Sequence, residues 1–244
     1  MSTRKPTPAT IAAEIRQLLR DGGSAAHAKG VQWFFKENIQ SHGWYTVKLR
    51  REAVRSRRTI REEFGLDFLL QVADKLFVGR ILEEKIFAVF LLEKQTAEFD
   101  DAGFRMVESW LDRISSWADH DGLVHYLIAP MIAAKSDRAE RVFHWAKSPD
   151  RWHRRAACVA LIQGTRQKMF SSEIKSLSNR LLSDEDDIVQ KGLGWLLRET
   201  AKADPKRTVP YLMRIREQTP RLVLRTACET LPPEVRKKIL ARPS

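Results

Sequence analysis

Helical periodicity runs through most of this chain of 244 residues. From about residue 66 onward, apolar residues recur at spacings of three and four, which is typical of amphipathic helices. Strand signals are weak, because Asp21-Gly22 and Asp121-Gly122 lie within helical patterns instead of between two alternating apolar runs. The pattern predicts helices at about 66–77, 80–96, 103–117, 120–134, 137–147, 150–164, 172–183, 186–203, 205–217, 220–230 and 233–241.

The helical segments fall into pairs of similar length. Those at about 137–164, 172–203 and 205–230 each have the size of a two-helix repeat of the HEAT kind. Upstream, Thr10 can cap a helix to about Leu19, and a second helix is expected from about Ser24 to His42. The sequence therefore predicts an all-α fold, a single right-handed curved α-solenoid over residues 1–244, with residues 1–9 as a flexible arm.

The charge balance favours a polyanionic partner. Lys and Arg number 43 against 31 Asp and Glu, a formal net charge of +12. Residues 48–63 concentrate this excess, with seven basic side chains and three acidic ones, Arg50 and Arg51 among the basic. Such a stretch predicts contact with DNA phosphates, and an arginine-rich solvated face is its alternative.

Several classes of protein are disfavoured by missing motifs. The sequence has no phosphate-binding glycine loop, dinucleotide fingerprint, zinc-protease motif or nucleophile elbow, so no metal and no cofactor is expected. Cys158 and Cys228 lie in apolar helical contexts, which predicts buried free thiols in a reducing compartment. No apolar run reaches eighteen residues, so the chain is expected to be cytosolic and not to span a membrane.

Three segments hold side chains suited to one site. Trp117 and Asp121 are four residues apart, so on a helix an indole and a carboxylate project side by side. Asp150 can cap a second helix whose first turns are basic and aromatic. In the third segment, 189–199, two glycines shortly before Trp195 permit close approach of another backbone or a substrate.

The three segments resemble the HEAT-like-repeat DNA alkylation repair family, the AlkD-type alkylpurine DNA glycosylases. The family has a Trp with an Asp four residues later, an Arg in a Trp-x-x-Arg-Ala-Ala setting, and a Trp in a Gln-Lys-Ala-x-Gly-Trp-x-Leu-Arg-Glu setting. The corresponding residues here are Trp117 and Asp121, Arg155 within 152–157, and Trp195 within 190–199. The resemblance extends from about Phe34 to Lys238 and is clearest between 110 and 205.

The resemblance implies a role for each of these side chains. Asp121 would be catalytic, Trp117, Trp195 and Phe34 would contact the lesion or its sugar, and Arg155 would hold a backbone phosphate. Further contacts with the DNA backbone are predicted at Arg154, Lys191, Arg198, Arg50 and Arg51, although Arg151 and Arg154 are also candidates for solvated side chains.

The implied activity is monofunctional excision of N3- or N7-alkylated purines from double-stranded DNA, as in base excision repair. Such a base is already cationic and needs no general acid, so a carboxylate that stabilises the oxocarbenium-like sugar suffices. Indole faces favour cations, by roughly 0.5–2 kcal/mol each. A monomer without cofactor is expected, in the cytoplasm with the nucleoid. N3-methyladenine and N7-methylguanine both suit this scheme, with or without base flipping.

Departures from the family pattern leave two other functions open. Ser116 and Ala118 stand where the family often has Trp and Asp, Asp119 is shifted by one, and Phe34 falls on a pocket Tyr. One alternative is a DNA-binding relative without excision that recognises damaged or branched DNA. The other is a protein-interaction scaffold, for which an apolar or acidic groove would be expected. For single residues, the alternatives are core packing for the two tryptophans and a helix-dipole carboxylate for Asp121.

Overall fold

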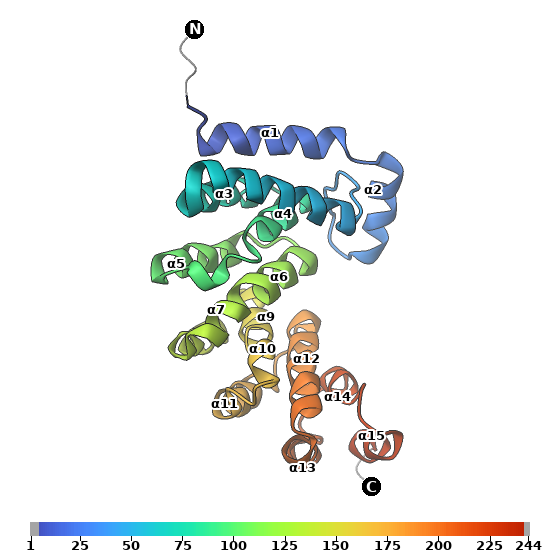
Figure 1. Ribbon diagram of the computed structural model, residues 1–244. Coiled ribbons are helices and arrows are strands. Elements are labelled where there is room, and N and C mark those ends of the chain that lie inside the picture. The colour runs from blue at the N-terminus through green and yellow to red at the C-terminus, as the bar shows by residue number, and fades with distance from the viewer. Residues whose placement is uncertain (1–4, 242–244) are drawn as a thin grey trace. The chain divides into compact units, whose positions relative to one another are not determined.

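The computed structural model describes residues 5–241, and all regular secondary structure in that range is helical (Figure 1). The only other pairing in this part of the chain is an isolated bridge between Gln40 and Ile81. The prediction of an all-α fold is confirmed. Within the same range, no helix is both long enough and apolar enough to cross a membrane.

The chain divides into two compact units, Met1–Leu127 and Ile128–Ser244. The single continuous domain that the sequence suggests stays a prediction. The helical elements of the first unit are α1 (Pro8–Asp21), α2 (Ala25–Val31), η1 (Gln32–Phe34), α3 (Thr46–Phe77), α4 (Leu82–Leu92), η2 (Thr96–Glu98), α5 (Asp101–Glu108), η3 (Ser109–Arg113) and α6 (Trp117–Leu123).

Helix α1 begins three residues earlier than the sequence predicts, because its cap is Thr7 and not Thr10. The Thr7 side chain accepts a hydrogen bond from the backbone N–H of Thr10, and Pro8 occupies the first helical position, where its missing N–H is harmless. Residues 8 and 9 therefore belong to α1 and not to a flexible arm. Residues 1–4 of the predicted arm lie outside the described part of the chain.

Helix α3 consists of two helical stretches that meet at Gly65. This residue has φ 82° and ψ −174°, a backbone conformation that L-residues avoid. The sequence predicts one or two helices over 48–63 and another at 66–77. The structure joins these segments in one bent element, α3. Helix α4 packs against α3 and is buried over most of its length, from Phe87 to Leu92.

The expected helix from Ser24 to His42 is wrong beyond Val31. After the short turn η1, the Gln32 side chain accepts from the N–H of Ile39 at 2.9 Å and donates to the carbonyl of Glu37 at 2.8 Å. These bonds satisfy backbone groups in a non-helical path. Further on, the buried Glu83 carboxylate accepts from Ser41 and from three successive backbone N–H groups, those of residues 42–44.

The second unit is built around α12. Its elements, with the π-helical turn η4 (Val124–Ile128) that precedes them, are α7 (Ala129–Ala134), η5 (Ser136–Glu140), α8 (Arg141–Trp145), α9 (Arg151–Val159), α10 (Ile162–Thr165), α11 (Ser171–Leu181), α12 (Asp187–Ala203), α13 (Pro205–Ile215), α14 (Arg221–Ala227) and α15 (Pro233–Leu240). Helix α12 packs against α9 and α14, and its buried residues include Leu193, Leu196 and Leu197. The observed segments follow the predicted periods closely.

Candidate functional site

The N-terminus of α6 carries the predicted pair Trp117 and Asp121. Ser116 is extended and caps the helix: its hydroxyl accepts from the N–H of Asp119, and the Asp119 carboxylate accepts from the N–H of Ser116 at 2.7 Å. This reciprocal capping box places the helix break at 114–116. The sequence ranges 103–117 and 120–134 put the break too late, but the prediction that Trp117 and Asp121 share one helix is confirmed.

A buried ion pair supports this capping box. Lys85 of α4 places its Nζ 2.9 Å from Oδ2 of Asp119, and both side chains are almost fully excluded from solvent. The ammonium also donates to the Ser115 hydroxyl and to the carbonyl of Arg113. With every donor of the Lys85 ammonium engaged, the pair fixes the start of α6 against α4. Asp119 is therefore a structural residue.

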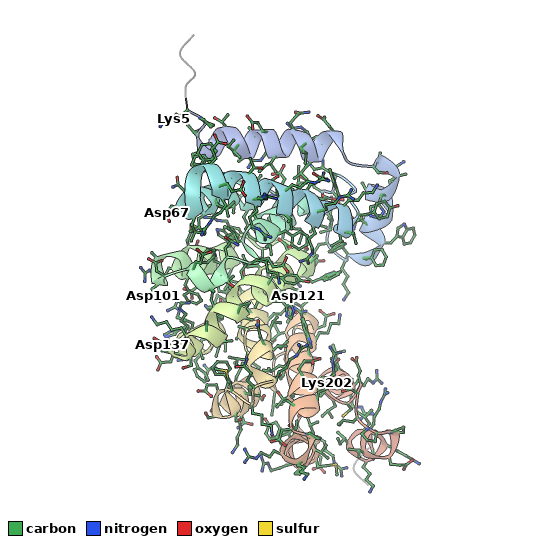
Figure 2. All side chains as sticks on the ribbon, in the orientation of Figure 1. Lys5, Asp67, Asp101, Asp121, Asp137 and Lys202 are labelled. Atoms are coloured by element: carbon green, nitrogen blue, oxygen red, sulfur yellow. The ribbon has the colours of Figure 1, made fainter. Side chains whose placement is uncertain are left out.

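The Asp121 carboxylate reaches the surface of the first unit, where Figure 2 labels it on α6. Its side chain is 21% exposed, and its Oδ1 lies 2.7 Å from Nδ1 of the fully buried His120. An ionised carboxylate only accepts hydrogen bonds, so a hydrogen bond to ionised Asp121 requires the proton on Nδ1 of His120. A carboxylate that is oriented by a buried donor and still partly open to solvent can face a developing positive charge.

Trp117 lies against the segment that follows α2. Its ring stacks on Phe35 with centroids 5.0 Å apart and planes inclined by 18°, and its Nε1 donates to the carbonyl of Phe34 at 3.3 Å. The side chain is still 38% exposed. Phe34, the aromatic that the resemblance assigns to the pocket, is 75% exposed, and the ring that stacks on Trp117 belongs to its neighbour.

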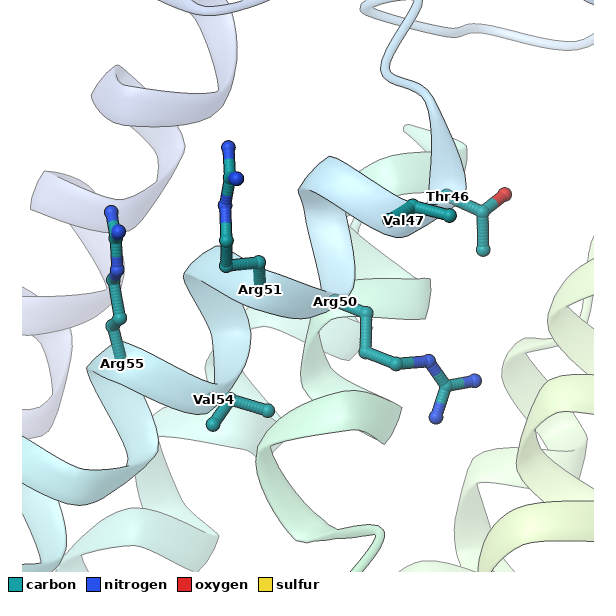
Figure 3. Close-up of a pocket in the computed structure, with 6 residues that line it drawn as sticks. All are labelled: Thr46, Val47, Arg50, Arg51, Val54 and Arg55. Carbon is teal, nitrogen blue, oxygen red and sulfur yellow. The ribbon is translucent and has the colours of Figure 1, made fainter.

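The arginines at the start of α3 differ in what they contact. Arg50 forms an ion pair with Glu93. Its Cζ also lies 4.0 Å from the ring centroid of Phe90 and 5.0 Å from that of Tyr126. Arg51 and Arg55 are exposed and extend together to the other side of the helix (Figure 3). The three line an open depression of about 400 Å³ with Thr46, Val47 and Val54. Arg51 and Arg55 are the more accessible cations of this depression.

Arg155, the predicted phosphate ligand, is buried in the second unit. Only 7% of the residue is exposed, and its guanidinium donates to the carbonyl of Ile188 at 2.8 Å. Gly192 of α12 makes room for it, because a Cβ there would lie 3.2 Å from Cγ of Arg155. Arg155 thus joins α9 to the first turn of α12.

Arg154 is also engaged by the protein, contrary to the prediction of a solvated side chain. Its Nε lies 2.7 Å from the nearly buried carboxylate of Asp184, and its Nη1 donates to the carbonyls of Ser148 and Pro149. The side chain is only 20% exposed. The acidic residues before α12 include this ion-pair partner of Arg154. Asp186 of the same run caps α12.

The other predicted contacts of α12 are partly exposed. Trp195 is half-buried, and Gly194 lets α14 approach, since a Cβ there would lie 2.6 Å from Thr226 and 3.0 Å from the carbonyl of Val223. This confirms the expectation that a backbone comes close beside Trp195. Lys191 forms an i,i+4 ion pair with Asp187 at 3.1 Å.

Arg198 contacts two carboxylates. It lies 3.1 Å from Glu199 and forms a second ion pair with Glu229. Burial opposes the charge of Glu199, but hydrogen bonds from Lys202 and Arg198 outweigh it and hold the pKa of Glu199 below its usual value. Arg198 is thus partly neutralised within the second unit.

The two cysteines are buried free thiols, as predicted. Burial raises the pKa of the Cys158 thiol to about 12 and that of Cys228 to about 11. Such thiols are poor nucleophiles at neutral pH. Over residues 5–241, no three His, Cys, Asp or Glu side chains gather as they would around a metal ion.

A family model described as "DNA alkylation repair enzyme" matches residues 15–231. The chain belongs to this family. Family membership supports a role in DNA repair, as the motifs around Trp117, Arg155 and Trp195 predict. No protein with a curated description matches the chain.

The fold of this family member is also found in a solved structure, a predicted DNA alkylation repair enzyme from Enterococcus faecalis. The TM-score is 0.77, with 16% sequence identity over 86% of this chain and 97% of the other. At that identity the match bears on the fold alone. It supports an all-α fold of helical repeats for the family member described above.

Three residues of the first unit were missed by sequence reasoning. Lys85 lies in an apolar helix, and its position between Glu84 and Ile86 does not show that it meets a carboxylate on α6. His120 carried no sign of its contact with Asp121 except direct adjacency. Phe35 follows Phe34 immediately, so only the path of the backbone decides which of the two rings stacks on Trp117.

Proposed function

We propose that the protein is a monofunctional DNA glycosylase that hydrolyses the N-glycosidic bond of N3- or N7-alkylated purines in duplex DNA. The observation that carries this proposal is the Asp121 carboxylate, which shares α6 with a partly exposed indole and is held by a buried histidine. A surface carboxylate that served only the helix dipole would need neither neighbour. DNA repair is the role of the family, and the glycosylase activity is our proposal.

The proposed reaction needs one carboxylate and one water molecule. The C1′–N bond breaks, and its electron pair goes to the base, whose positive charge is thereby neutralised. Asp121 stabilises the positive charge that remains on the sugar, and the oxygen of water forms the new bond to C1′. The proton that the water loses passes to Asp121 or to solvent. Trp117, and Trp195 as the resemblance implies, would favour the cationic lesion and sugar.

DNA binding in this proposal depends on the excess of positive charge. The net charge of +12 and the exposed cations Arg51 and Arg55 favour phosphate contact. Arg154 and Arg155 are engaged within the second unit, so their contribution to phosphate binding requires side-chain atoms that remain accessible. Duplex affinity should fall linearly with salt on a logarithmic plot, with a slope of about 0.9 per phosphate neutralised. We further propose a monomer that needs no cofactor and acts in the cytoplasm, with the nucleoid.

The decisive experiment is Asp121→Asn, measured as single-turnover release of N7-methylguanine from methylated duplex DNA. Asparagine keeps the shape but lacks the charge, so the rate should fall by roughly 100-fold or more, while DNA affinity changes little. Asp119→Asn is unsuitable as a control, because Asp119 is the buried partner of Lys85. Asp67→Asn is the matched control, since Asp67 is an exposed carboxylate of the same unit.

Each outcome of this experiment decides between functions. A loss confined to Asp121→Asn supports the glycosylase. An unimpaired Asp121→Asn, with release by the wild type, would overturn the catalytic assignment. Salt-dependent DNA binding without any base release by the wild type would favour a relative that recognises damaged DNA without excision.

A further inference from the structure

Trp33 is the most exposed of the large apolar side chains in residues 5–241. It is 90% exposed, whereas Trp110, Trp145 and Trp152 are buried in the cores of their units. Phe34 beside it is also largely exposed. Indole offers one of the largest apolar surfaces of any side chain, and two adjacent aromatics open to water are typical of a contact surface.

The backbone that carries Trp33 is fixed on both sides. Before it, the Gln32 side chain donates to the carbonyl of Glu37 and accepts from the N–H of Ile39. These two hydrogen bonds hold the backbone that follows η1. After it, Phe35 stacks on Trp117, and the carbonyl of Phe34 accepts from the Trp117 indole. Trp33 therefore projects from a supported turn, and a ligand would meet an indole whose backbone is already ordered.

The sequence around Trp33 is basic. Residues 25–55 contain six Lys and Arg against two Glu. Helix α2, which leads into η1, is tied to the start of α3 by a stack between His27 and Tyr45 with centroids 4.0 Å apart, and Lys48 lies over the Tyr45 ring. The exposed Arg51 and Arg55 follow on the first turns of α3. A basic or purely apolar partner surface would not complement this excess of cations.

Exposed aromatic rings among cations match one ligand chemistry, a nucleobase on a phosphate backbone. Within a paired duplex, bases stack on each other and offer no free face. A base opposite a lost or weakly paired partner does, and an aromatic side chain can then stack on it or insert beside it. We propose that Trp33 stacks on an unstacked nucleobase of damaged DNA. The proposal rests on the DNA-binding role proposed above and assigns this side chain to recognition, not to bond cleavage.

The test uses two duplexes, one fully paired and one with 2-aminopurine opposite a tetrahydrofuran abasic analogue. Wild type should bind the second more tightly and quench the 2-aminopurine fluorescence. Trp33→Ala should lose roughly 10-fold in affinity for the abasic duplex, the size of one base–aromatic stack, with much less loss on the paired duplex. Trp33→Phe should retain most of the preference and the quenching. Val78→Ala is the control, as an exposed apolar side chain of the same unit that directly follows the last residue of α3.

The outcomes separate this inference from the proposed function. If Trp33→Ala leaves both affinities unchanged, or lowers them equally, the stacking role is overturned, and a protein-facing role for the exposed pair gains support instead. If wild type releases N7-methylguanine while Trp33→Ala keeps the preference for the abasic duplex, only this inference fails. If wild type quenches 2-aminopurine through Trp33 but releases no methylated base, only the glycosylase proposal fails.

Discussion

The starts of α6 and α9 both have an acidic residue that caps a helix, but they place their charges differently. At α6 the capping Asp119 is buried and paired with Lys85, while Asp121 and Trp117 reach solvent. At α9 the cap Asp150 is at the surface, and the basic side chains Arg154 and Arg155 turn into the protein. In the first unit, a buried ion pair thus supports an accessible site. In the second unit, Arg154 and Arg155, which the motif suggests are functional, instead connect α9 to α12 and the residues just before it.

The largest loss of stability is expected when the buried carboxylate of Asp119 in α6 loses its counter-ion, Lys85. Lys85→Met removes the ammonium and leaves Asp119 buried without a counter-ion, so the free energy of unfolding should fall by about 3–5 kcal/mol. Urea denaturation followed by circular dichroism measures it. Adding Asp119→Asn to this variant should recover part of the loss, because no isolated charge remains. A loss below about 1 kcal/mol for Lys85→Met would show that the pair does not support α6.

A smaller effect is expected where α14 approaches α12. Gly194→Ala places a methyl group against Thr226 and the carbonyl of Val223, which should destabilise the protein by about 2 kcal/mol. Gly30→Ala is the matched control, because a Cβ at this helical glycine meets nothing within 4 Å. Alanine there should raise the melting temperature slightly, through its higher helix propensity. Equal melting temperatures for the two variants would contradict the close approach.

The smallest loss of stability is expected on substitution of Arg154, the arginine that was expected to be solvated. Arg154→Ala removes the ion pair with Asp184 but leaves that carboxylate a hydrogen bond from the N–H of Asp186, so a loss of about 1 kcal/mol is expected. Arg207→Ala, at a strongly exposed arginine of the same unit, should change the unfolding free energy by less than about 0.5 kcal/mol. If the two variants unfold at the same urea concentration, Arg154 behaves as a surface residue after all.

The regular parts of the fold were predictable from sequence because helical periodicity is a local property. The observed bounds of α11, α12 and α13 differ from the predicted periods by two residues or fewer at each end. The segment after Val31 was not predictable in this way, since its path depends on the side chain of Gln32 bonding to backbone groups five and seven residues away. In such segments, hydrogen bonds from a side chain to nearby backbone groups compete with the helical hydrogen bonds and determine the path of the chain.

The candidate site was predictable only in part. Spacing alone places Trp117 and Asp121 on one helix, and the structure agrees. The support of that helix comes from Lys85, which is 34 residues before Asp119 in sequence, and no local pattern reveals such a partner. The same holds for Arg154, whose carboxylate partner lies 30 residues later. Contacts between distant helices therefore determine which charged residues of a motif are accessible.

The bend of α3 at Gly65 depends on the handedness of the polypeptide. A Cβ at this position would meet no atom within 4 Å, so space does not select glycine. The dihedral angles, φ 82° and ψ −174°, are the mirror image of an extended L-residue, and they are relaxed for a D-residue. In a chemically synthesised chain, D-alanine at position 65 would therefore accept the bend, whereas L-alanine would oppose it. Gly65, the single achiral residue of α3, thus lets the chain turn between the two stretches of this helix.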